Sequence, residues 1–283
     1  MSGFRAACVQ NTATREIAAN VAWVCERIDE AAAQGADFIA LPETVGLIEP
    51  VNERIPASTY GETGDIGLAA FRSRAAKHGV TILVGSQLIR EDGKIFNRSF
   101  LLDSAGDIRA RYDKLHMFDI ELKHGEASRE SDASAPGDRA VIVETEWGKL
   151  GLSICYDLRF GALYRALAQG GAEFITIPAA FTQTTGQAHW HILVRARAIE
   201  TGCFVFAAAQ GGRHENGRST FGHSLVVSPW GEIIAEAGTD PGVILARIDP
   251  AEVAEARTRI PALTHDRPFV TAGPDDELKR AAS

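Results

Sequence analysis

The sequence predicts one α/β domain in which helices cover a mixed β-sheet or two stacked sheets. Apolar runs of strand length alternate with longer segments whose apolar residues recur every three or four positions, which is typical of helices packed on a sheet. Strands joined by turn signals lie between these units, which indicates that antiparallel pairs are mixed with parallel ones. No linker, composition shift or repeat divides the chain. We therefore expect residues 1–270 to form a single domain and residues 271–283 a C-terminal tail.

The chain begins with a β-α-β unit. An apolar run at residues 4–9 predicts a strand, and residues 17–34 predict a helix that ends at Gly35. A second buried strand is predicted at residues 37–41, directly before Pro42 and Glu43. Because such units cross over with a right hand, the two strands are expected to be parallel.

The next part of the chain combines loops, a helix and a hairpin. Residues 45–64 predict an irregular loop over a site, and the turn signal at residues 103–107 predicts a hairpin. The helix and strands expected here are at residues 68–78, 80–84, 95–102 and 108–112. Residues 118–138 are polar and lack periodicity, and loops of this length in compact domains are often functional.

The second half of the chain again alternates strands and helices. Strands are predicted at residues 140–144, 150–154, 174–177, 204–209, 224–227, 233–235 and 243–248, and helices at 160–169, 189–201 and 251–259. On the helix at 189–201, one face can be formed by Ile192, Leu193, Ala196 and Ile199.

Composition excludes several classes of function. The net charge of −8 and the absence of a basic run predict no nucleic-acid partner. No apolar stretch approaches the roughly 18 residues that cross a membrane. The first residues lack the features of a signal peptide, so we expect a cytoplasmic location and no membrane partner.

One of the four cysteines differs from the others. Cys8, Cys25 and Cys203 lie in predicted strands or a helix and are interpreted as structural, and no CxxC pair suggests a metal site. Cys155 comes at the turn between a buried strand and a helix. Helix amides at such a turn would favour a thiolate and offer an oxyanion site. The alternative interpretation of Cys155 is a buried core residue.

Two further reactive side chains follow predicted strands. Glu43 comes just after the strand at 37–41, and Lys114 just after the strand at 108–112. Ligands of α/β sheets bind at the carboxyl ends of strands, so both side chains could meet Cys155 in one pocket. A carboxylate can act as the base for a thiol, and an ammonium can stabilise negative charge on a carbonyl oxygen. Taken singly, Glu43 could instead be a helix cap or loop acid, and Lys114 a surface lysine.

Three segments resemble the signatures of the nitrilase superfamily of carbon–nitrogen hydrolases. They are Leu-Pro-Glu at 41–43, Tyr-Asp-Lys-Leu-His at 112–116 and Ile-Cys-Tyr-Asp-Leu-Arg at 154–159. The resemblance implies a four-layer αββα sandwich, no metal or organic cofactor, and homodimers formed through helices. It also implies that Glu43, Lys114 and Cys155 are catalytic, and that Glu130 in the polar loop assists in positioning.

Further motifs are similar to the Nit subgroup of that superfamily. They include Pro-Ala-Ala-Phe at 178–181, Thr-Thr-Gly-Gln-Ala-His-Trp at 184–190 and Gly-His-Ser at 222–224. The subgroup contains ω-amidases and amidases of deaminated glutathione, and residues 129–131 and 207–214 favour the second. The resemblance thus implies cleavage of deaminated glutathione to 2-oxoglutarate and Cys-Gly through a thioester. The alternatives are an ω-amidase that releases ammonia from 2-oxoglutaramate or 2-oxosuccinamate, and a catalytically idle interaction scaffold.

Such a substrate carries carboxylates, so this acidic protein must supply local arginines. The candidates are Arg159, Arg195, Arg197 and Arg213. Arg159 could equally be a structural ion-pair partner, and at most one of Arg195 and Arg197 is expected to reach a ligand, because residues two apart on a helix face different ways. The backbone N–H of Tyr156 is expected to complete the oxyanion site, and Phe181 to form a wall of the pocket. We predict no metal site.

Overall fold

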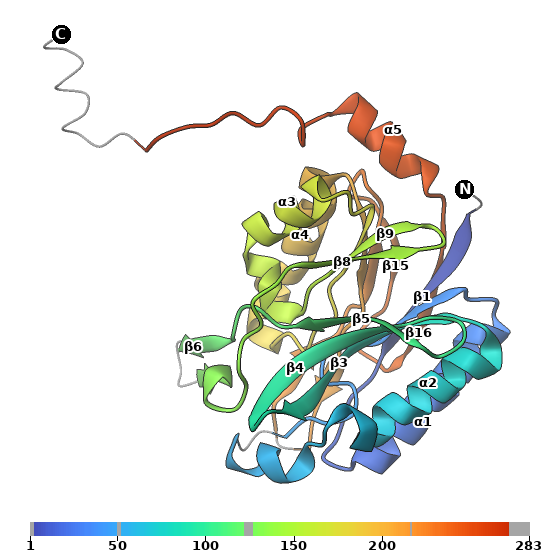
Figure 1. Ribbon diagram of the computed structural model, residues 1–283, viewed down its shortest axis with the longest axis vertical. Helices are drawn as coiled ribbons and strands as arrows, with labels where there is room; N and C mark the ends of the chain where they lie inside the picture. Colours follow the sequence, from blue (N-terminus) through green and yellow to red (C-terminus); the bar gives the residue numbers. More distant parts are fainter. Residues whose placement is uncertain (1–2, 50–51, 122–126, 216, 272–283) are drawn as a thin grey trace, which may run out of the picture.

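Two six-stranded sheets are stacked face to face with helices on their outer sides (Figure 1). The structure is a computed structural model that describes residues 3–49, 52–121, 127–215 and 217–271. The first sheet has the strand order β16-β1-β2-β3-β4-β5, and the second the order β15-β14-β11-β10-β9-β8. This arrangement confirms the predicted α/β class with two stacked mixed sheets.

The first sheet combines a parallel centre with antiparallel edges. Its strands are β1 (Phe4–Gln10), β2 (Phe38–Ala40), β3 (Thr81–Glu91), β4 (Lys94–Leu102), β5 (Ile108–Asp113) and β16 (Gly242–Ile248). The strand pair β1–β2 is parallel, as the β-α-β pattern predicted, and β2–β3 is parallel as well. Helices α1 (Ile17–Ala33) and α2 (Ile66–His78) cover this sheet. Alternation along β1 directs Ala7 and Val9 toward these helices, and Ala6 and Cys8 toward the second sheet.

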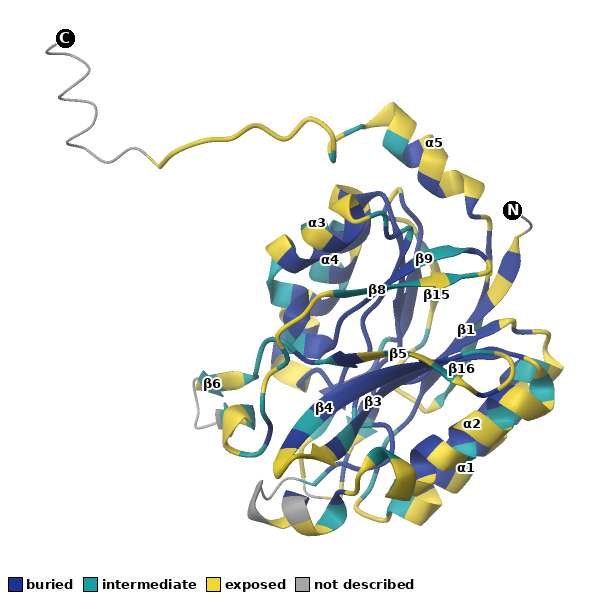
Figure 2. Cartoon of the chain, in the orientation of Figure 1, coloured by how far each residue is buried: buried dark blue, intermediate teal, exposed yellow. Residues whose placement is uncertain are grey.

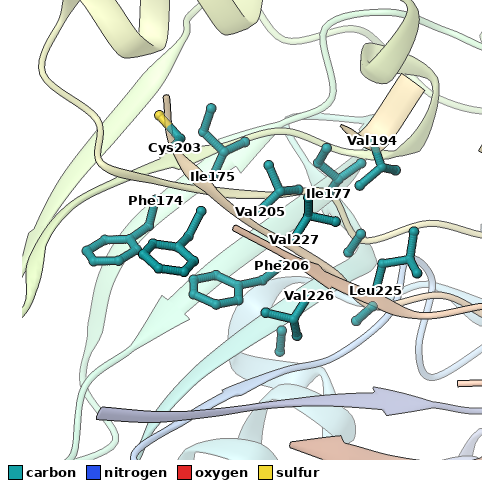
Figure 3. Close-up of a cluster of buried hydrophobic side chains, with 14 of the residues drawn as sticks. Phe174, Ile175, Ile177, Val194, Cys203, Val205, Phe206, Leu225, Val226 and Val227 are labelled. Carbon is teal, nitrogen blue, oxygen red and sulfur yellow. The ribbon is translucent and has the colours of Figure 1, made fainter. Parts of the chain in front are cut away.

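The second sheet is built in the same way. Its strands are β8 (Val141–Thr145), β9 (Gly148–Leu152), β10 (Phe174–Thr176), β11 (Phe204–Ala207), β14 (Leu225–Val227) and β15 (Ile233–Glu236), with α3 (Gly161–Gln169) and α4 (Gln183–Thr201) outside. Strand β10 lies parallel to both of its neighbours. Figure 3 shows side chains of β10, β11 and β14 packed closely, with Val194 of α4 among them. These apolar runs are buried on both faces, which is typical of central parallel strands.

Aromatic rings fill the space between the sheets. The ring of Phe4 stacks on Trp147 with centroids 4.3 Å apart, and Phe38 contacts Phe206 at 5.1 Å. Figure 2 shows the central strands of both sheets buried, whereas the edge strands and the outer sides of the helices are partly exposed. The packed sheets therefore fix the ends of their strands, and with them the first residues of the loops that follow.

Some predicted boundaries differ from the structure. Strand β3 runs on to Glu91 and turns into β4 through Asp92 and Gly93, whose φ angles are both positive (49° and 76°). Such a two-residue turn suits the twist of a hairpin. Helix α4 begins at Gln183 rather than at residue 189, because Thr182 caps its first turn. The polar residues 118–138 contain a small hairpin of β6 (Asp119–Glu121) and β7 (Ala127–Arg129).

Other short elements were not predicted. The irregular residues 45–64 include the 3₁₀ turns Asn52–Ser58 and Glu62–Gly64. A second small hairpin pairs β12 (Gly211–Arg213) with β13 (Ser219–Phe221). The chain after Cys155 first forms a 3₁₀ turn, Cys155–Arg159, and only then helix α3.

The last described helix is α5 (Ala251–Arg259), and it contacts the end of α4. Arg257 Nε donates a hydrogen bond to the carbonyl oxygen of Thr201 at 3.1 Å. The grouping of residues 1–270 into one domain remains a prediction, and most of the predicted tail, residues 272–283, lies outside the described residues. Within the described ranges, no helix combines the length and apolarity that a membrane crossing requires.

Candidate active site

A cavity of about 120 Å³ opens where loops from both sheets meet. Glu43, Lys114, Glu130 and Cys155 all line it, so the structure brings the four predicted catalytic residues together. Glu43 follows β2 and Lys114 follows β5, while Cys155 comes after β9 of the other sheet. The structure thus confirms the prediction that the side chains after these three strands meet in one pocket.

Lys114 lies between two carboxylates. Its Nζ donates to Glu43 Oε1 at 2.8 Å and to Glu130 Oε2 at 2.8 Å, and its side chain is 2% exposed. Burial alone would lower the pKa of Lys114, but the negative charges of Glu130 and Glu43 outweigh it and hold this pKa well above the usual value. Lys114 is therefore a fixed, buried ammonium.

Glu43 is held from several directions. Its Oε2 accepts a hydrogen bond from the Ala180 N–H at 2.8 Å, and Gln210 Nε2 donates to its backbone oxygen at 2.8 Å. Burial would raise the pKa of Glu43, yet the Lys114 charge and the hydrogen bonds from Lys114, Cys155 and Ala180 hold it below the usual 4.5. Glu43 is thus an ionised carboxylate held in one position.

Asn97 on β4 is a member of this group that the sequence did not reveal. Its Nδ2 donates to Glu43 Oε1 and to Glu130 Oε1, both at 3.0 Å, and its backbone oxygen accepts from the Lys114 N–H at 3.0 Å. Asn97 is 2% exposed. The available signal was a run of polar residues, Asn97 to Ser99, inside an otherwise apolar strand, since buried polar side chains need partners.

Cys155 has a strained backbone and a protonated thiol. Its φ is +45°, an uncommon value for a residue other than glycine, and its N–H donates to the Pro178 oxygen at 2.8 Å. Burial and the negative charge of Glu43 raise the pKa of Cys155 well above 9.0, although Lys114 acts in the opposite direction. The prediction of a favoured thiolate is therefore wrong. The protonated thiol instead forms a hydrogen bond with the Glu43 carboxylate.

Asp157 fixes the turn that carries Cys155. It is fully buried and accepts hydrogen bonds from the Tyr112 hydroxyl at 2.6 Å and from the Ile154 N–H at 2.8 Å. The N–H and ring Nδ1 of His116 contact its other oxygen at 3.1 and 2.7 Å. Asp157 thus ties the turn at Cys155 to the chain on both sides of Lys114.

Only some of the residues predicted to bind substrate lie at the cavity. Phe181 lines the cavity, and the ring of Tyr156 packs on Phe118, another lining residue, at 5.1 Å. Arg159 lies over the ring of Phe181, with its guanidinium carbon 5.4 Å from the ring centre, but is not itself part of the lining.

Arg195 and Arg213 are likewise outside the described lining of the cavity. Arg195 donates to the Gly231 oxygen at 2.8 Å, and Arg213 is exposed on β12. The arginine found in the lining is Arg218, in the loop between β12 and β13. Sequence gave no signal for it, because the fold alone brings this loop to the cavity.

Away from the cavity, two histidines share one carboxylate oxygen. His191 Nε2 and His223 Nδ1 each lie 2.9 Å from Glu236 Oε1. One nitrogen of each histidine and the carboxylate oxygen lie within 4.8 Å of one another. By this spacing, the three residues could hold a metal ion. Hydrogen bonds from both histidines hold the pKa of Glu236 below the usual value against the effect of burial. This pairing accounts for the cluster without an ion, and the absence of a metal site remains a prediction.

The gathered side chains have complementary chemistry. A thiol lies against an ionised carboxylate, which can take its proton, and a buried ammonium lies beside both. The ammonium can stabilise negative charge that develops on a carbonyl oxygen. Such a set suits nucleophilic attack on an acyl carbon.

Comparison with known proteins supports this interpretation. A family model described as carbon–nitrogen hydrolase matches residues 5–258. A protein of Synechocystis sp. named deaminated glutathione amidase is 38% identical over 275 residues, which cover 95% of this chain and all of that protein.

Solved structures share the fold. The Caenorhabditis elegans NitFhit protein matches with a TM-score of 0.87 at 34% identity over 94% of this chain, which spans 66% of that protein. Saccharomyces cerevisiae Nit3, described as a member of branch 10 of the nitrilase superfamily, matches with a TM-score of 0.82 at 26% identity, covering 92% of this chain and 94% of Nit3. The family model matches most of this chain, and the solved structures share its fold. The chain therefore belongs to the carbon–nitrogen hydrolase family of the nitrilase superfamily, and it is a hydrolase of carbon–nitrogen bonds other than peptide bonds.

Proposed function

We propose that this enzyme is a cysteine-dependent amidase that cleaves deaminated glutathione into 2-oxoglutarate and Cys-Gly. The observation that carries the proposal is the placement of Lys114 between Glu43 and Glu130 at the cavity that Cys155 lines. The name of the Synechocystis relative, at 38% identity over its whole length, supports this choice of substrate.

In the proposed first half-reaction, Cys155 forms a bond to the amide carbon while Glu43 accepts the thiol proton. The carbonyl electron pair moves to oxygen, and the Lys114 ammonium and the Tyr156 N–H stabilise the resulting oxyanion. When the oxyanion collapses, the carbon–nitrogen bond breaks and Glu43 returns the proton to the leaving nitrogen. A thioester on Cys155 and a free amine result.

In the second half-reaction, Glu43 takes a proton from water, which attacks the thioester. The second oxyanion uses the same donors, and the departing sulfur regains the proton from Glu43 as the carboxylic acid is released. Glu130 acts as a positioning residue, since its carboxylate accepts from Lys114 Nζ and from the Phe118 N–H at 2.8 Å. The chemistry of the chain's own groups is sufficient for each step.

Parallel assays would test the proposal. Deaminated glutathione, 2-oxoglutaramate and 2-oxosuccinamate are offered to the native enzyme and to Cys155→Ala. The proposal expects the highest kcat/KM with deaminated glutathione and loss of all turnover in Cys155→Ala. Ammonia release from the short amides alone would identify an ω-amidase instead. Absence of Cys155-dependent turnover with every amide would favour an interaction scaffold.

We also propose that the enzyme acts in the cytoplasm as a homodimer, without nucleic-acid or membrane partners. The net charge of −8 and the lack of a basic run support the absence of a nucleic-acid partner. Support for a dimer comes from α4, where Ile192 is 70% and Ile199 is 55% exposed. Seven positions apart, they share one face of the helix, with the exposed Arg195 between them, and a second copy would cover these two apolar side chains.

A further inference from the structure

The turn that carries Glu43 has a strained backbone. Thr44, the next residue, has a φ of +46°, which is unfavourable for a β-branched residue. Such a conformation persists only where contacts with the rest of the molecule hold it. If the turn relaxed, the backbone of Glu43 would rotate and carry its side chain with it. The contacts that hold Thr44 therefore also determine where the Glu43 carboxylate lies.

Ser86 on β3 holds this turn from within the first sheet. Its Oγ accepts a hydrogen bond from the Thr44 N–H at 2.8 Å, and its own N–H donates to the Pro42 oxygen at 3.2 Å. Ser86 is fully buried, so these bonds are shielded from water. They do not involve the carbonyl oxygens of Glu43 and Thr44, which need hydrogen-bond partners of their own.

The side chain of Gln210, between β11 and β12, binds both of these oxygens. Its Nε2 donates to the Glu43 oxygen at 2.8 Å and to the Thr44 oxygen at 3.1 Å, and its Oε1 accepts from the Ala13 N–H at 2.8 Å. The amide cannot be reversed, because its oxygen would then face two carbonyl oxygens. Gln210 is fully buried, and it connects the second sheet with two loops of the first.

The backbone of Gln210 binds a segment that contacts both Cys155 and Glu43. The Gln210 N–H donates to the Ala179 oxygen at 2.8 Å. The residue before Ala179 accepts from the Cys155 N–H at 2.8 Å, and the residue after it, Ala180, donates to Glu43 Oε2 at 2.8 Å. Gln210 thus holds the backbone of Glu43 with its side chain and, with its main chain, the segment that lies between Glu43 and Cys155.

We propose that Gln210 is a positioning residue, which keeps the strained turn at Glu43 and Thr44 in place and thereby holds the Glu43 carboxylate against the Cys155 thiol. The inference rests on the amidase function proposed above and adds a residue that acts through the base of that reaction. Gln210 is not among the described residues that line the cavity, so it does not act on the substrate directly. A displacement of a reacting group by roughly 1 Å can lower a rate about 100-fold.

Gln10 on β1 provides a matched control. It is also fully buried, its Nε2 donates to the Gly238 and Asp240 oxygens at 2.8 and 2.9 Å, and its Oε1 accepts from the Ser224 N–H at 3.0 Å. Like Gln210, it therefore binds two backbone oxygens and one backbone N–H. None of its three backbone partners belongs to the described lining of the cavity. Substitution by methionine removes the same kinds of hydrogen bond at both positions, and only one of them adjoins the proposed base.

The kinetic test compares native enzyme, Gln210→Met and Gln10→Met with deaminated glutathione and 2-oxoglutaramate, at a temperature where circular dichroism shows all three folded. Both variants should have a lower Tm, because each leaves buried backbone groups without partners. We expect only Gln210→Met to lower kcat, by about 10- to 100-fold, with KM close to the native value. An equal fall of kcat in both variants, or native kcat in Gln210→Met, would overturn the proposal.

A second variant tests whether Gln210 acts by holding the strained turn. Glycine adopts a positive φ readily, so Thr44→Gly removes the strain that Gln210 opposes. Added to Gln210→Met, it should restore part of the lost kcat, and it should also raise the Tm of a Gln210→Met protein that folds poorly. A double variant with the same kcat and Tm as Gln210→Met would contradict this role of Gln210.

Labelling of Cys155 by iodoacetamide, followed on its peptide by mass spectrometry, needs no amide turnover and so separates this inference from the amidase function. Burial and the Glu43 charge raise the pKa of the Cys155 thiol, so a displaced carboxylate lets this thiol ionise at lower pH. We expect labelling to increase at lower pH in Gln210→Met than in native enzyme or Gln10→Met. Identical pH profiles in all three proteins would contradict the inference even if the amidase is active. A shift in Gln210→Met alone would support it even if the enzyme cleaves a different amide.

Discussion

At the scale of single residues, the site is defined by which groups carry charge at rest. Glu43 is ionised because Lys114, Asn97, Ala180 and Cys155 surround its two oxygens, and the Cys155 thiol stays protonated because it is buried against that carboxylate. In the proposed mechanism, the thiol proton therefore moves to Glu43 only when Cys155 attacks the substrate. A protonated cysteine in the resting enzyme is also less exposed to oxidation than a thiolate.

These charges predict the pH dependence of kcat/KM. Activity needs ionised Glu43, whose pKa lies below 4.5, and the neighbouring thiol has a pKa well above 9.0. As pH falls, Glu43 stays ionised until the pH drops through its lowered pKa, and as pH rises, the Cys155 thiol stays protonated beyond roughly pH 9. We therefore expect neither Glu43 nor Cys155 to cause a step in kcat/KM between roughly pH 5 and pH 9. A step near neutral pH in a substrate-saturation series would contradict the charge state inferred for Glu43.

Asn97→Asp should move the acid limb of that profile. The change removes a donor to Glu43 and adds a like charge about 3 Å away, and both effects raise the pKa of Glu43. We expect a lower kcat together with an acid limb at higher pH than in the native enzyme. Asn97→Leu removes the donor without adding a charge and should shift the limb less. Identical acid limbs in all three proteins would show that Asn97 does not act through Glu43.

The grouping of Glu43, Lys114 and Cys155 at one cavity could be predicted at this scale, whereas the residues that support them could not. Glu43, Lys114 and Cys155 each follow an apolar strand, and that order is visible along the chain. Asn97 and Arg218 acquire their positions only from contacts between segments distant in sequence. The protonation of Cys155 was mispredicted because it depends on burial and on Glu43, which lies more than a hundred residues away in sequence.

At the scale of elements, short irregular segments rather than long helices place the reactive atoms. Cys155 begins a 3₁₀ turn, and the buried Asp157 ties this turn to Tyr112 at the end of β5 and to His116 just beyond Lys114. Cys155 and Lys114 are thus positioned by the same carboxylate, that of Asp157. Sequence patterns predicted the long elements well, because periodicity follows burial on one face. They missed β12, β13, β6 and β7, each of which has only three residues.

Asp157→Asn should therefore weaken both the fold and the reaction. An amide cannot accept all the hydrogen bonds that the carboxylate receives, so buried donors lose their charged partner. We expect the free energy of unfolding in urea to fall by about 2–3 kcal/mol and kcat to fall at least tenfold at a temperature where the variant is folded. Asp138→Asn, whose side chain is 84% exposed, serves as the matched control and should change neither quantity.

A loss of stability in Asp157→Asn with native kcat would limit Asp157 to a structural role. Native stability and native kcat together would contradict the network as described. Near-ultraviolet circular dichroism at the assay temperature shows whether the remaining population is folded.

At the scale of the whole molecule, the stacking of two sheets creates the site. Neither sheet alone contains it, because Glu43 and Lys114 follow strands of the first sheet and Cys155 follows a strand of the second. The fold class was predictable from alternating strands and helices, whereas the outer face of α4 was not. Ile192 and Ile199 were expected to share a face, and they do so on the exposed side, while Trp190 and Val194 pack inward.

Ile192→Asp tests the role of that exposed face. A charge in the middle of an interface between two copies would have to be desolvated, so it should shift a dimer toward monomers. We expect light scattering to give the mass of a dimer for the native enzyme and of a monomer for the variant at micromolar concentration. Ile66→Asp, on α2 and 50% exposed, should remain dimeric. A native monomer, or a dimer in Ile192→Asp, would contradict this use of α4.

The central claim of a thioester on Cys155 is tested most directly by mass spectrometry. Native enzyme is mixed with deaminated glutathione, quenched in acid during turnover and digested, so that a thioester survives on its peptide. We predict a 2-oxoglutaryl group on the peptide that contains Cys155, released by hydroxylamine and absent from Cys155→Ala. Turnover of the substrate with Cys155 unmodified at every quench time, or with the same rate in Cys155→Ala, would contradict the account.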